Sequence, residues 1–138
     1  MTLKELQAKY PGATEDTWHR HTNGGGWVKN TAIVHDSAWV SDNACMSGDA
    51  RVSGNACVSG DAWEWSPLYI QGSMHCLCQP TLQTIKIGCV EMPLAEWLKT
   101  YEAVGVTHGY TSEQIAEYGL YLRVCADLEV LRKGRLAL

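Results

Sequence analysis

The sequence predicts a mixed β and α fold, in which a short parallel β-helix of about two coils precedes a small strand region and two C-terminal α-helices. Three observations lead to this prediction. Between Gly26 and Pro67 a small residue recurs every six positions, and a branched apolar residue usually follows it two positions later. After Pro67 this period stops, and short segments with the pattern of strands follow. Beyond residue 93 the apolar residues recur at spacings of three and four, which is the helical period.

The repeat consists of the hexads GWVKNT, AIVHDS, AWVSDN, ACMSGD, ARVSGN, ACVSGD and AWEWSP. Each hexad of a β-helix supplies one short strand and one corner. Strand side chains alternate between faces, so the small and the branched residues point inward and the residue between them points outward. Gly, Asp and Asn at the last two positions tolerate the left-handed backbone of a corner. The pattern resembles the left-handed parallel β-helix of hexapeptide-repeat proteins, whose triangular coil contains three hexads.

The outward positions of this β-helix predict columns of stacked side chains. Residues one coil apart, about 18 positions, would lie about 4.8 Å apart on the same face. The predicted columns are Trp27–Cys45–Trp63, Trp39–Cys57 and Ile33–Arg51. Because tryptophan has a large apolar surface, we expect either the C-terminal segment or neighbouring subunits to cover these columns, or the columns to form an aromatic binding wall.

The predicted binding site lies where the repeat ends. Aromatic side chains there would stack on a planar group, and arginine, glutamine and histidine would bind polar or phosphate groups. The candidate binding residues are Trp27 of the first column and, at the end of the repeat, Arg51, Trp63, Trp65, Tyr69, Gln71 and His75. Two coils alone would be marginally stable, so we expect a homo-oligomer, either a trimer or a dimer.

Three regions are expected along the chain. Residues 1–25 would form an N-terminal helix and cap, residues 26–67 the β-helix, and residues 68–138 the strands and the two helices. The second of these helices is predicted to start at Thr111, because Gln114 three positions later completes a capping box.

Cysteines and histidines of the C-terminal region have two interpretations. His75, Cys76, Cys78 and Cys89 are of the residue types that bind zinc. Zinc sites usually have paired ligands on both arms, whereas here one arm carries C-x-C and the other a single cysteine. We therefore favour buried, reduced cysteines over a metal site, and we expect no cofactor.

Composition and charge restrict the class of partner. The chain has 138 residues and a formal net charge of −4. The only dense basic run is RKGR near the C-terminus, so we expect no direct nucleic-acid binding. No apolar run approaches the roughly 20 residues of a membrane span, and the first residues do not resemble a secretion signal. We expect a cytoplasmic protein with no membrane contact.

Several motifs outside the repeat are more specific than the repeat itself. They are WHRHTNGGGW before the repeat and SPL-x-IQGS-x-H, IGC, EWL-x-x-Y and GYT-x-EQI-x-EY after it. Together with the hexads they resemble a set of small proteins of phages and prophages, and the resemblance covers almost the whole chain. The resemblance implies a fold with these same parts, and it assigns no catalytic residue.

This resemblance implies a non-enzymatic accessory protein that binds and antagonises a component of the host cell. The most specific function that the resemblance implies is that of an anti-defence inhibitor, similar in action to anti-CRISPR proteins. One alternative is a sponge that sequesters a small nucleotide-like signalling ligand. Another is a relative of hexapeptide acyltransferases, with His35 as the base beside Arg51 and Ser53. Only Asp36 is placed to orient that histidine and no phosphate loop or nucleophile motif is present, so we expect no enzyme.

Overall fold

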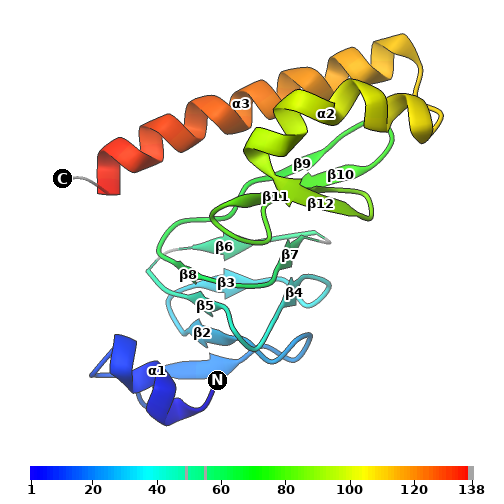
Figure 1. Cartoon of the computed structure of the whole chain (residues 1–138). Helices are drawn as coiled ribbons and strands as arrows, with labels where there is room; N and C mark the ends of the chain where they lie inside the picture. The colour runs from blue at the N-terminus through cyan, green and yellow to red at the C-terminus, as the bar shows by residue number, and fades with distance from the viewer. Residues whose placement is uncertain (49, 55, 137–138) are drawn as a thin grey trace. The chain divides into compact units, whose positions relative to one another are not determined.

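The computed structural model describes residues 1–48, 50–54 and 56–136, with the side chains of residues 133–136 outside that description (Figure 1). The chain divides into two compact units. Unit 1 contains Met1–Tyr69 and Cys78–Leu82, and unit 2 contains Ile70–Leu77 and Gln83–Leu138. In chain order the elements are α1 (Leu3–Lys9), β1 (Trp18–Arg20), β2 (Trp27–Lys29), β3 (Ile33–Val34), β4 (Trp39–Val40), β5 (Cys45–Met46), β6 (Arg51–Val52), β7 (Cys57–Val58), β8 (Ala62–Trp63), β9 (Tyr69–Gln71), β10 (Cys76–Cys78), β11 (Thr84–Ile87), β12 (Val90–Pro93), α2 (Leu94–Thr107) and α3 (Ser112–Leu136).

The inward positions of the hexads form the core of unit 1. In most hexads the small residue and the larger apolar residue two positions later are buried, as the alternation of strand side chains predicts, whereas Val34 is half-buried and the last hexad departs from the pattern. The buried members are Ala32, Ala38, Ala44, Ala50 and Ala56, with Val28, Val40, Met46, Val52 and Val58. Small residues alternate with large ones, which lets the side chains of the core interdigitate. The predicted inward positions are therefore confirmed at these residues.

Three parallel strand pairs have the predicted spacing. β2 pairs with β5, β3 with β6 and β4 with β7, and the partners are Trp27 with Cys45, Ile33 with Arg51, and Trp39 with Cys57. The hydroxyls of Thr31 and Ser37 add bonds between successive turns of chain, because they donate to the carbonyls of Gly48 and Gly54. The predicted pairing of residues one coil apart is thus confirmed in these three pairs.

In the fourth parallel pair, β5 with β8, the paired residues are one position closer together in the sequence than in the other three pairs. In β5 and β8, Cys45 pairs with Ala62 and Met46 pairs with Trp63. Trp63 consequently points inward and is completely buried, and its Nε1 donates to the carbonyl of Gly60 at 2.9 Å. The predicted alignment of Trp63 with Cys45 on the outer face is therefore wrong.

The shortening occurs at the corner that precedes β8. At the two preceding corners Gly48 and Gly54 adopt the left-handed backbone, each with a φ of 61°. At the third corner Asp61, with a φ of 69°, takes this conformation in place of Gly60. Aspartate is among the few residues that tolerate it. A corner that falls one position later exchanges the inward and outward positions of the strand that follows.

Hydrogen bonds to the segment Cys78–Leu82 hold this displaced corner. The amides of Ser59 and Gly60 both donate to the carbonyl of Pro80, at 2.8 and 3.3 Å. The amide of Leu82 donates to the Asp61 carboxylate at 2.7 Å. The sequence pattern of the hexads contains no signal for these bonds, because they come from residues outside the repeat.

The predicted left-handed parallel β-helix is wrong. Unit 1 instead contains several small separate sheets, of which two have only two strands each and none is closed. The largest of them has the order β1-β2-β5-β8 and is mixed, because β1 runs antiparallel to β2. The physical reason is the small number of hexads. β3–β6 and β4–β7 each form a single pair of two-residue strands, and the segments that flank the repeat end the pairing rather than continue it.

The N-terminal segment covers the outward column of β2 and β5. A second core cluster contains Leu6 of α1 with Ala13, Trp18, Trp27 and Cys45. The helix itself starts at a capping box between Thr2 and Glu5. The expected cover from the C-terminal segment or a neighbouring subunit is therefore not needed for Trp27 and Cys45, since α1 and the turn after it bury both.

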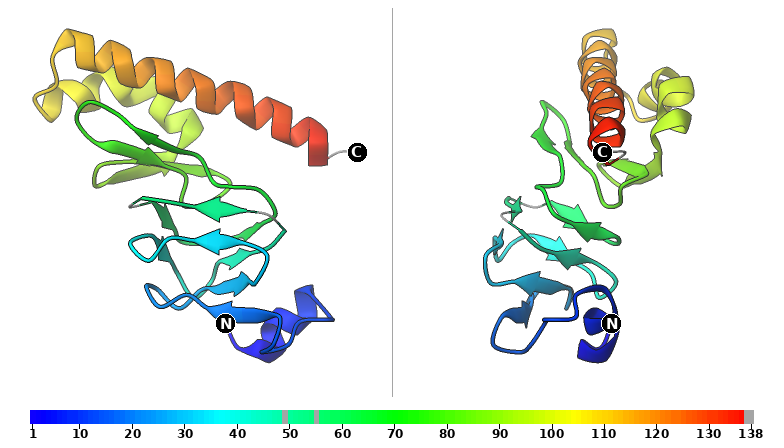
Figure 2. Two further views of the ribbon diagram at one scale, coloured as in Figure 1. Left: turned by 180° about the vertical axis from the view of Figure 1, so that it is seen from behind. Right: turned by 90° about the vertical axis from the view of Figure 1, so that its left-hand side faces the viewer.

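Unit 2 consists of a four-stranded sheet and the two long helices. The sheet has the order β12-β11-β10-β9, and β11 and β12 form an antiparallel hairpin. Helices α2 and α3 lie side by side in both orientations of Figure 2. They approach closely where glycines face larger residues. A Cβ on Gly105 would lie 2.6 Å from Ile115, and one on Gly119 would lie 2.8 Å from the Tyr101 ring.

The predicted start of the last helix is confirmed. The Gln114 amide donates to the Thr111 hydroxyl at 3.2 Å, and the Thr111 amide donates to the Gln114 side chain at 2.8 Å. Tyr118, Leu122 and Cys125 form the buried stripe of α3. Among the described residues, no helix combines the length and apolar character that a membrane crossing requires.

Replacement of the inward Trp63 by alanine should cost roughly 3–5 kcal/mol of unfolding free energy, because it leaves a large cavity. The matched change Trp39→Ala, at a side chain that is 46% exposed, should cost about 1 kcal/mol or less. Chemical denaturation of the full-length chain, followed by circular dichroism, measures the unfolding free energy of both variants. Equal losses for the two variants would contradict the shortened register of β8.

Candidate functional site

The sequence-predicted binding residues fall in both units and in different environments. Trp27 is buried in unit 1, with the Arg20 guanidinium 4.5 Å from its ring centroid. Trp63 is buried in the core, and Trp65 packs edge-on against it at 6.4 Å between ring centroids. These tryptophans form part of the interior of unit 1 rather than an exposed aromatic wall.

The remaining predicted residues are more accessible. Arg51 is exposed in unit 1, and Tyr69 lies against Gly54, where an added Cβ would come within 3.0 Å of the Tyr69 hydroxyl. Gln71 and His75 belong to unit 2 and are exposed. Of the seven predicted residues, His75 is the one that lines a pocket of unit 2.

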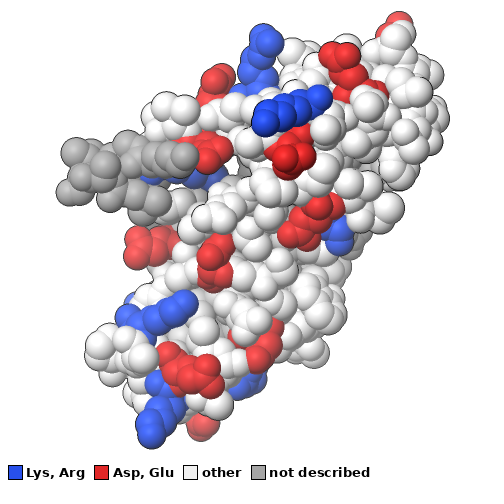
Figure 3. All heavy atoms as spheres, viewed as in Figure 1, with Lys and Arg blue, Asp and Glu red and all other residues white. Residues whose placement is uncertain are grey.

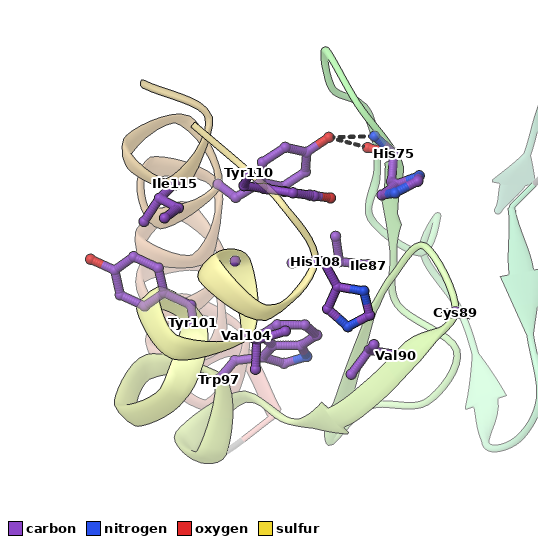
Figure 4. A pocket seen from close by; sticks show the side chains of 12 residues that line it. His75, Ile87, Cys89, Val90, Trp97, Tyr101, Val104, His108, Tyr110 and Ile115 are labelled. Atoms are coloured by element: carbon purple, nitrogen blue, oxygen red, sulfur yellow. Dashed lines mark hydrogen bonds between the residues drawn. The ribbon is translucent and has the colours of Figure 1, made fainter. Parts of the chain in front are cut away.

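The turn that carries His75 is held by the side chain of Tyr118 on α3. The Tyr118 hydroxyl accepts the amides of Met74 and His75, at 3.1 and 2.6 Å, and donates to the His75 carbonyl at 2.5 Å. The two bonds to His75 are the dashed lines in Figure 4. Gly72 is required beside this hydroxyl, because an added Cβ would lie 2.5 Å from it.

Glu117, the neighbour of Tyr118, holds the same turn from its N-terminal side. Its carboxylate accepts the hydroxyl and the amide of Ser73, at 2.5 and 2.9 Å, and the hydroxyl of Tyr121 at 2.7 Å. The bonds from Ser73, followed by the bond from Tyr121, lower the pKa of Glu117 from its ordinary value. The bond to this carboxylate raises the pKa of Tyr121.

A pocket of about 40 Å³ lies between the helices and the hairpin of unit 2 (Figure 4). Its lining comes from β11, β12 and the turn between them, from α2 and α3, and from the two connections that contain His75 and His108. The lining residues are His75, Ile87, Cys89, Val90, Trp97, Tyr101, Val104, Gly105, His108, Tyr110, Ile115 and Tyr118. Apolar and aromatic side chains dominate this set, and His75, Cys89 and His108 are its exposed members.

The aromatic rings on one side of the pocket contact one another in a row, each tilted relative to the next. The ring centroids of His75 and Tyr110 are 5.9 Å apart, and those of Tyr110 and Tyr118 are 5.4 Å apart. Gly88, in the turn of the hairpin, has a φ of 60° and lies under the His75 ring, where a Cβ would come within 3.1 Å. Burial raises the pKa of the Tyr110 hydroxyl. Helix, turn and hairpin thus fix the position of the His75 ring.

Trp97 fixes the opposite side of the pocket. It is buried, and its Nε1 donates to the carbonyl of Ile85 in β11 at 2.7 Å. This bond ties the first turn of α2 to the sheet. It also satisfies the polar atom of a side chain that is otherwise apolar, as buried tryptophans require.

The polar groups of the pocket come from few residue types. Histidines, tyrosines and one cysteine supply donors and acceptors, but none of the twelve lining residues is a carboxylate, lysine or arginine. A base in a catalytic set normally needs a partner that orients it. The ring nitrogen of His35, the base of the acyltransferase alternative, lies 3.0 Å from the hydroxyl of Ser37 in unit 1.

The cysteines and the histidine considered for zinc belong to different units. Cys78 is buried in the core of unit 1, whereas His75 and Cys89 line the pocket of unit 2. Within the described part of the chain, no group of three or more His, Cys, Asp or Glu side chains is arranged to hold a metal ion. The six cysteines are thiols and form no disulfide with one another.

Most residues of this pocket were not predicted as a site from the sequence. His75 was predicted, whereas His108, Tyr110 and Val104 were not. A signal was nevertheless present, since the motifs IQGS-x-H, IGC, EWL-x-x-Y and GYT-x-EQI-x-EY all contribute residues to the pocket or to the bonds that hold its turn. They are separated by helices and strands in the sequence, and only the fold of unit 2 brings them together.

Protonation of Glu117 should release the turn that carries His75. Because the pKa of Glu117 is lowered, the bonds from Ser73 contribute stability above its ordinary value of 4.5 and are lost as the pH falls through the lowered pKa. An NMR titration of the Ser73 amide measures this transition. It should disappear in Glu117→Gln and persist in Glu113→Gln, a matched change on the same helix. A transition that persists in Glu117→Gln would contradict the assignment.

The thiols should differ sharply in reactivity. Cys89 is exposed at the rim of the pocket, whereas burial raises the pKa of Cys125 to about 11. At mildly alkaline pH an alkylating reagent should modify Cys89 in the native protein and Cys125 only after denaturation. Mass spectrometry of the alkylated peptides identifies the sites. Rapid native labelling of Cys125 would show that α3 is not packed as described.

Comparisons with known proteins assign no family to this architecture. No protein-family model, no curated protein and no solved structure matches the chain.

Proposed function

We propose that this chain is a non-enzymatic binding protein and that the pocket of unit 2 receives an apolar side chain of a protein partner. The observation that carries the proposal is the pocket itself. It is small and mainly apolar, it is held by hydrogen bonds on two sides, and no carboxylate lines it. Pockets of this kind at protein interfaces receive the anchor side chains that contribute most of the binding energy.

The size of the pocket favours a side chain over a nucleotide. Its volume is about 40 Å³. An apolar cavity that binds benzene measures roughly 150 Å³, so a nucleobase does not fit. The end of an aliphatic side chain does fit, and it would contact Ile87, Val90 and Val104. The exposed rings of His75 and His108 would then lie at the edge of the contact, where hydrogen bonds are made with partial access of water.

Exposed apolar side chains extend the surface available to a partner. Among the described residues, large apolar side chains that are exposed concentrate in unit 2, which supports protein binding by this unit. They are Met74, Leu98, Val106, Leu120, Val124, Val130 and Leu131. Leu120, Val124 and Leu131 share one side of α3. A second copy of the chain on this row would give the expected homo-oligomer.

The resemblance to small phage and prophage proteins supports a component of the bacterial host as the partner, and an anti-defence inhibitor as the biological role. The charge distribution supports a protein rather than a nucleic acid as the target. In the face that Figure 3 displays, acidic and basic side chains are interspersed, and no continuous basic surface is visible. The proposed setting is the cytoplasm of the host cell, where a partner and this chain would meet.

Filling the pocket should abolish partner binding. Val104 lines the pocket, whereas Ile33 is a 55% exposed side chain of unit 1, outside the surface proposed for the partner, so Val104→Phe and Ile33→Phe are compared. We expect Ile33→Phe to retain the partner that wild-type protein captures from a host lysate, and Val104→Phe to lose it. Quantitative mass spectrometry of the captured proteins measures the difference.

A milder variant separates blocking from misfolding. Val90→Ile adds one methyl group to the pocket lining and should weaken binding while the unfolding midpoint stays close to that of the wild type. Equal capture by all variants, or no protein specifically captured by the wild type, would contradict the proposal.

A further inference from the structure

A second concave site lies in unit 1 and is much larger than the pocket of unit 2. It is a depression of about 340 Å³, lined by the end of α1, the turn that follows and the strands β1 and β2. Sites for small molecules usually measure roughly 300–1,000 Å³. The depression is therefore large enough for a small ligand, whereas the pocket of about 40 Å³ in unit 2 is not.

Two lysines and two aromatic rings define the chemistry of this depression. Lys9 is the last residue of α1, and Lys29 is the cross-strand partner of Trp18 in the antiparallel pair β1–β2. Directly opposed residues project from the same face of a sheet, so Lys29 lies beside the Trp18 ring. The Tyr10 ring packs on Trp18 with 4.8 Å between centroids, and both rings line the depression.

The local structure holds these groups in place. The Tyr10 amide donates to the carbonyl of Leu6 at 2.9 Å, and the Ala13 amide donates to the carbonyl of Tyr10 at 2.9 Å. Trp18 is only 3% exposed and forms the rigid base, while Tyr10 is half-buried above it. A Cβ on Gly12 would meet no atom within 4 Å, so the turn leaves the depression open on that side.

The charge of the lining is positive and unbalanced. No carboxylate lines the depression, although Glu15 and Asp16 are exposed in the nearby loop. The ion pairs of Asp42 with Arg20 and with the N-terminal ammonium involve neither Lys9 nor Lys29. The two ammonium groups are therefore available to an anion from solvent.

We infer that this depression binds a small aromatic anion, that is, a planar ring that carries a phosphate or a carboxylate. The ammonium groups of Lys9 and Lys29 bind the anionic group through charge-assisted hydrogen bonds. The planar body lies against Tyr10 and the apolar surface of the turn, which a free inorganic anion would leave uncovered. The inference does not rest on the proposed protein-binding function, because every lining residue belongs to unit 1.

The test is a titration of the full-length chain with phenyl phosphate and benzoate, followed by amide chemical shifts in NMR spectra. The expected result is a saturable shift of the amides of residues 9, 10, 12–18 and 29. Lys9→Ala and Lys29→Ala should each weaken binding about fivefold or more, because each removes one charge-assisted contact. Lys4→Ala, the same change at an exposed position of α1 outside the depression, should leave the affinity unchanged. Lys29→Arg should retain most of the affinity.

Three outcomes would overturn the inference. The first is the absence of saturable shifts with either aromatic anion. The second is equal binding of inorganic phosphate, which would show that the rings contribute nothing. The third is equal binding of benzyl alcohol, which would show that the lysines contribute nothing. Comparison of adenosine monophosphate with phenyl phosphate then separates a nucleotide from a simpler aromatic phosphate, and Val104→Phe, the variant that blocks the pocket of unit 2, should bind both as the wild type does.

Discussion

The left-handed backbone at Asp61 is the constraint on which the rest of unit 1 depends. Because the corner falls at Asp61 and not at Gly60, β8 pairs with β5 one residue early and Trp63 points into the core. The indole of Trp63 belongs to the same core cluster as the inward alanines and valines of the hexads. The same aspartate accepts the amide of Leu82, so the repeat ends where a later segment of the chain is tied to it. One backbone conformation thus ends the period, buries a tryptophan and anchors the segment Cys78–Leu82.

In unit 2 a comparable role falls to two adjacent side chains of α3. Tyr118 and Glu117 accept the amides of Ser73, Met74 and His75. Such bonds matter because they tie an exposed turn to the helix α3. The turn then holds the His75 ring against Tyr110, at the rim of the pocket. The shape of the pocket is therefore coupled to the ionisation of a carboxylate that does not line it.

The two concave sites differ in the physical property that decides their ligands. The pocket of unit 2 is apolar and small, which suits one side chain of a protein. The depression of unit 1 is larger and carries two ammonium groups, which suits an anion with a planar body. Each proposal rests on residues of one unit only, so each can fail without the other. Trp27 and Trp63, which the repeat pattern predicted as part of an aromatic binding wall, belong to neither site. Both side chains are buried in the core clusters of unit 1.

The sequence by itself determined the inward positions of the hexads, the pairing of Trp27 with Cys45 and of Trp39 with Cys57, and the capping box at Thr111, because these depend on local periodicity and on short-range hydrogen bonds. The sequence also contains the motifs whose residues line the pocket, but it does not show that these motifs come together in the fold. Tertiary structure decided that small separate sheets form instead of a β-helix, that Asp61 displaces the last corner, and that α1 covers Trp27. Each of these follows from contacts between residues far apart in the chain, whose energies no local pattern encodes. For the same reason only the folded chain places Lys29 beside Trp18 and His75 against Tyr110.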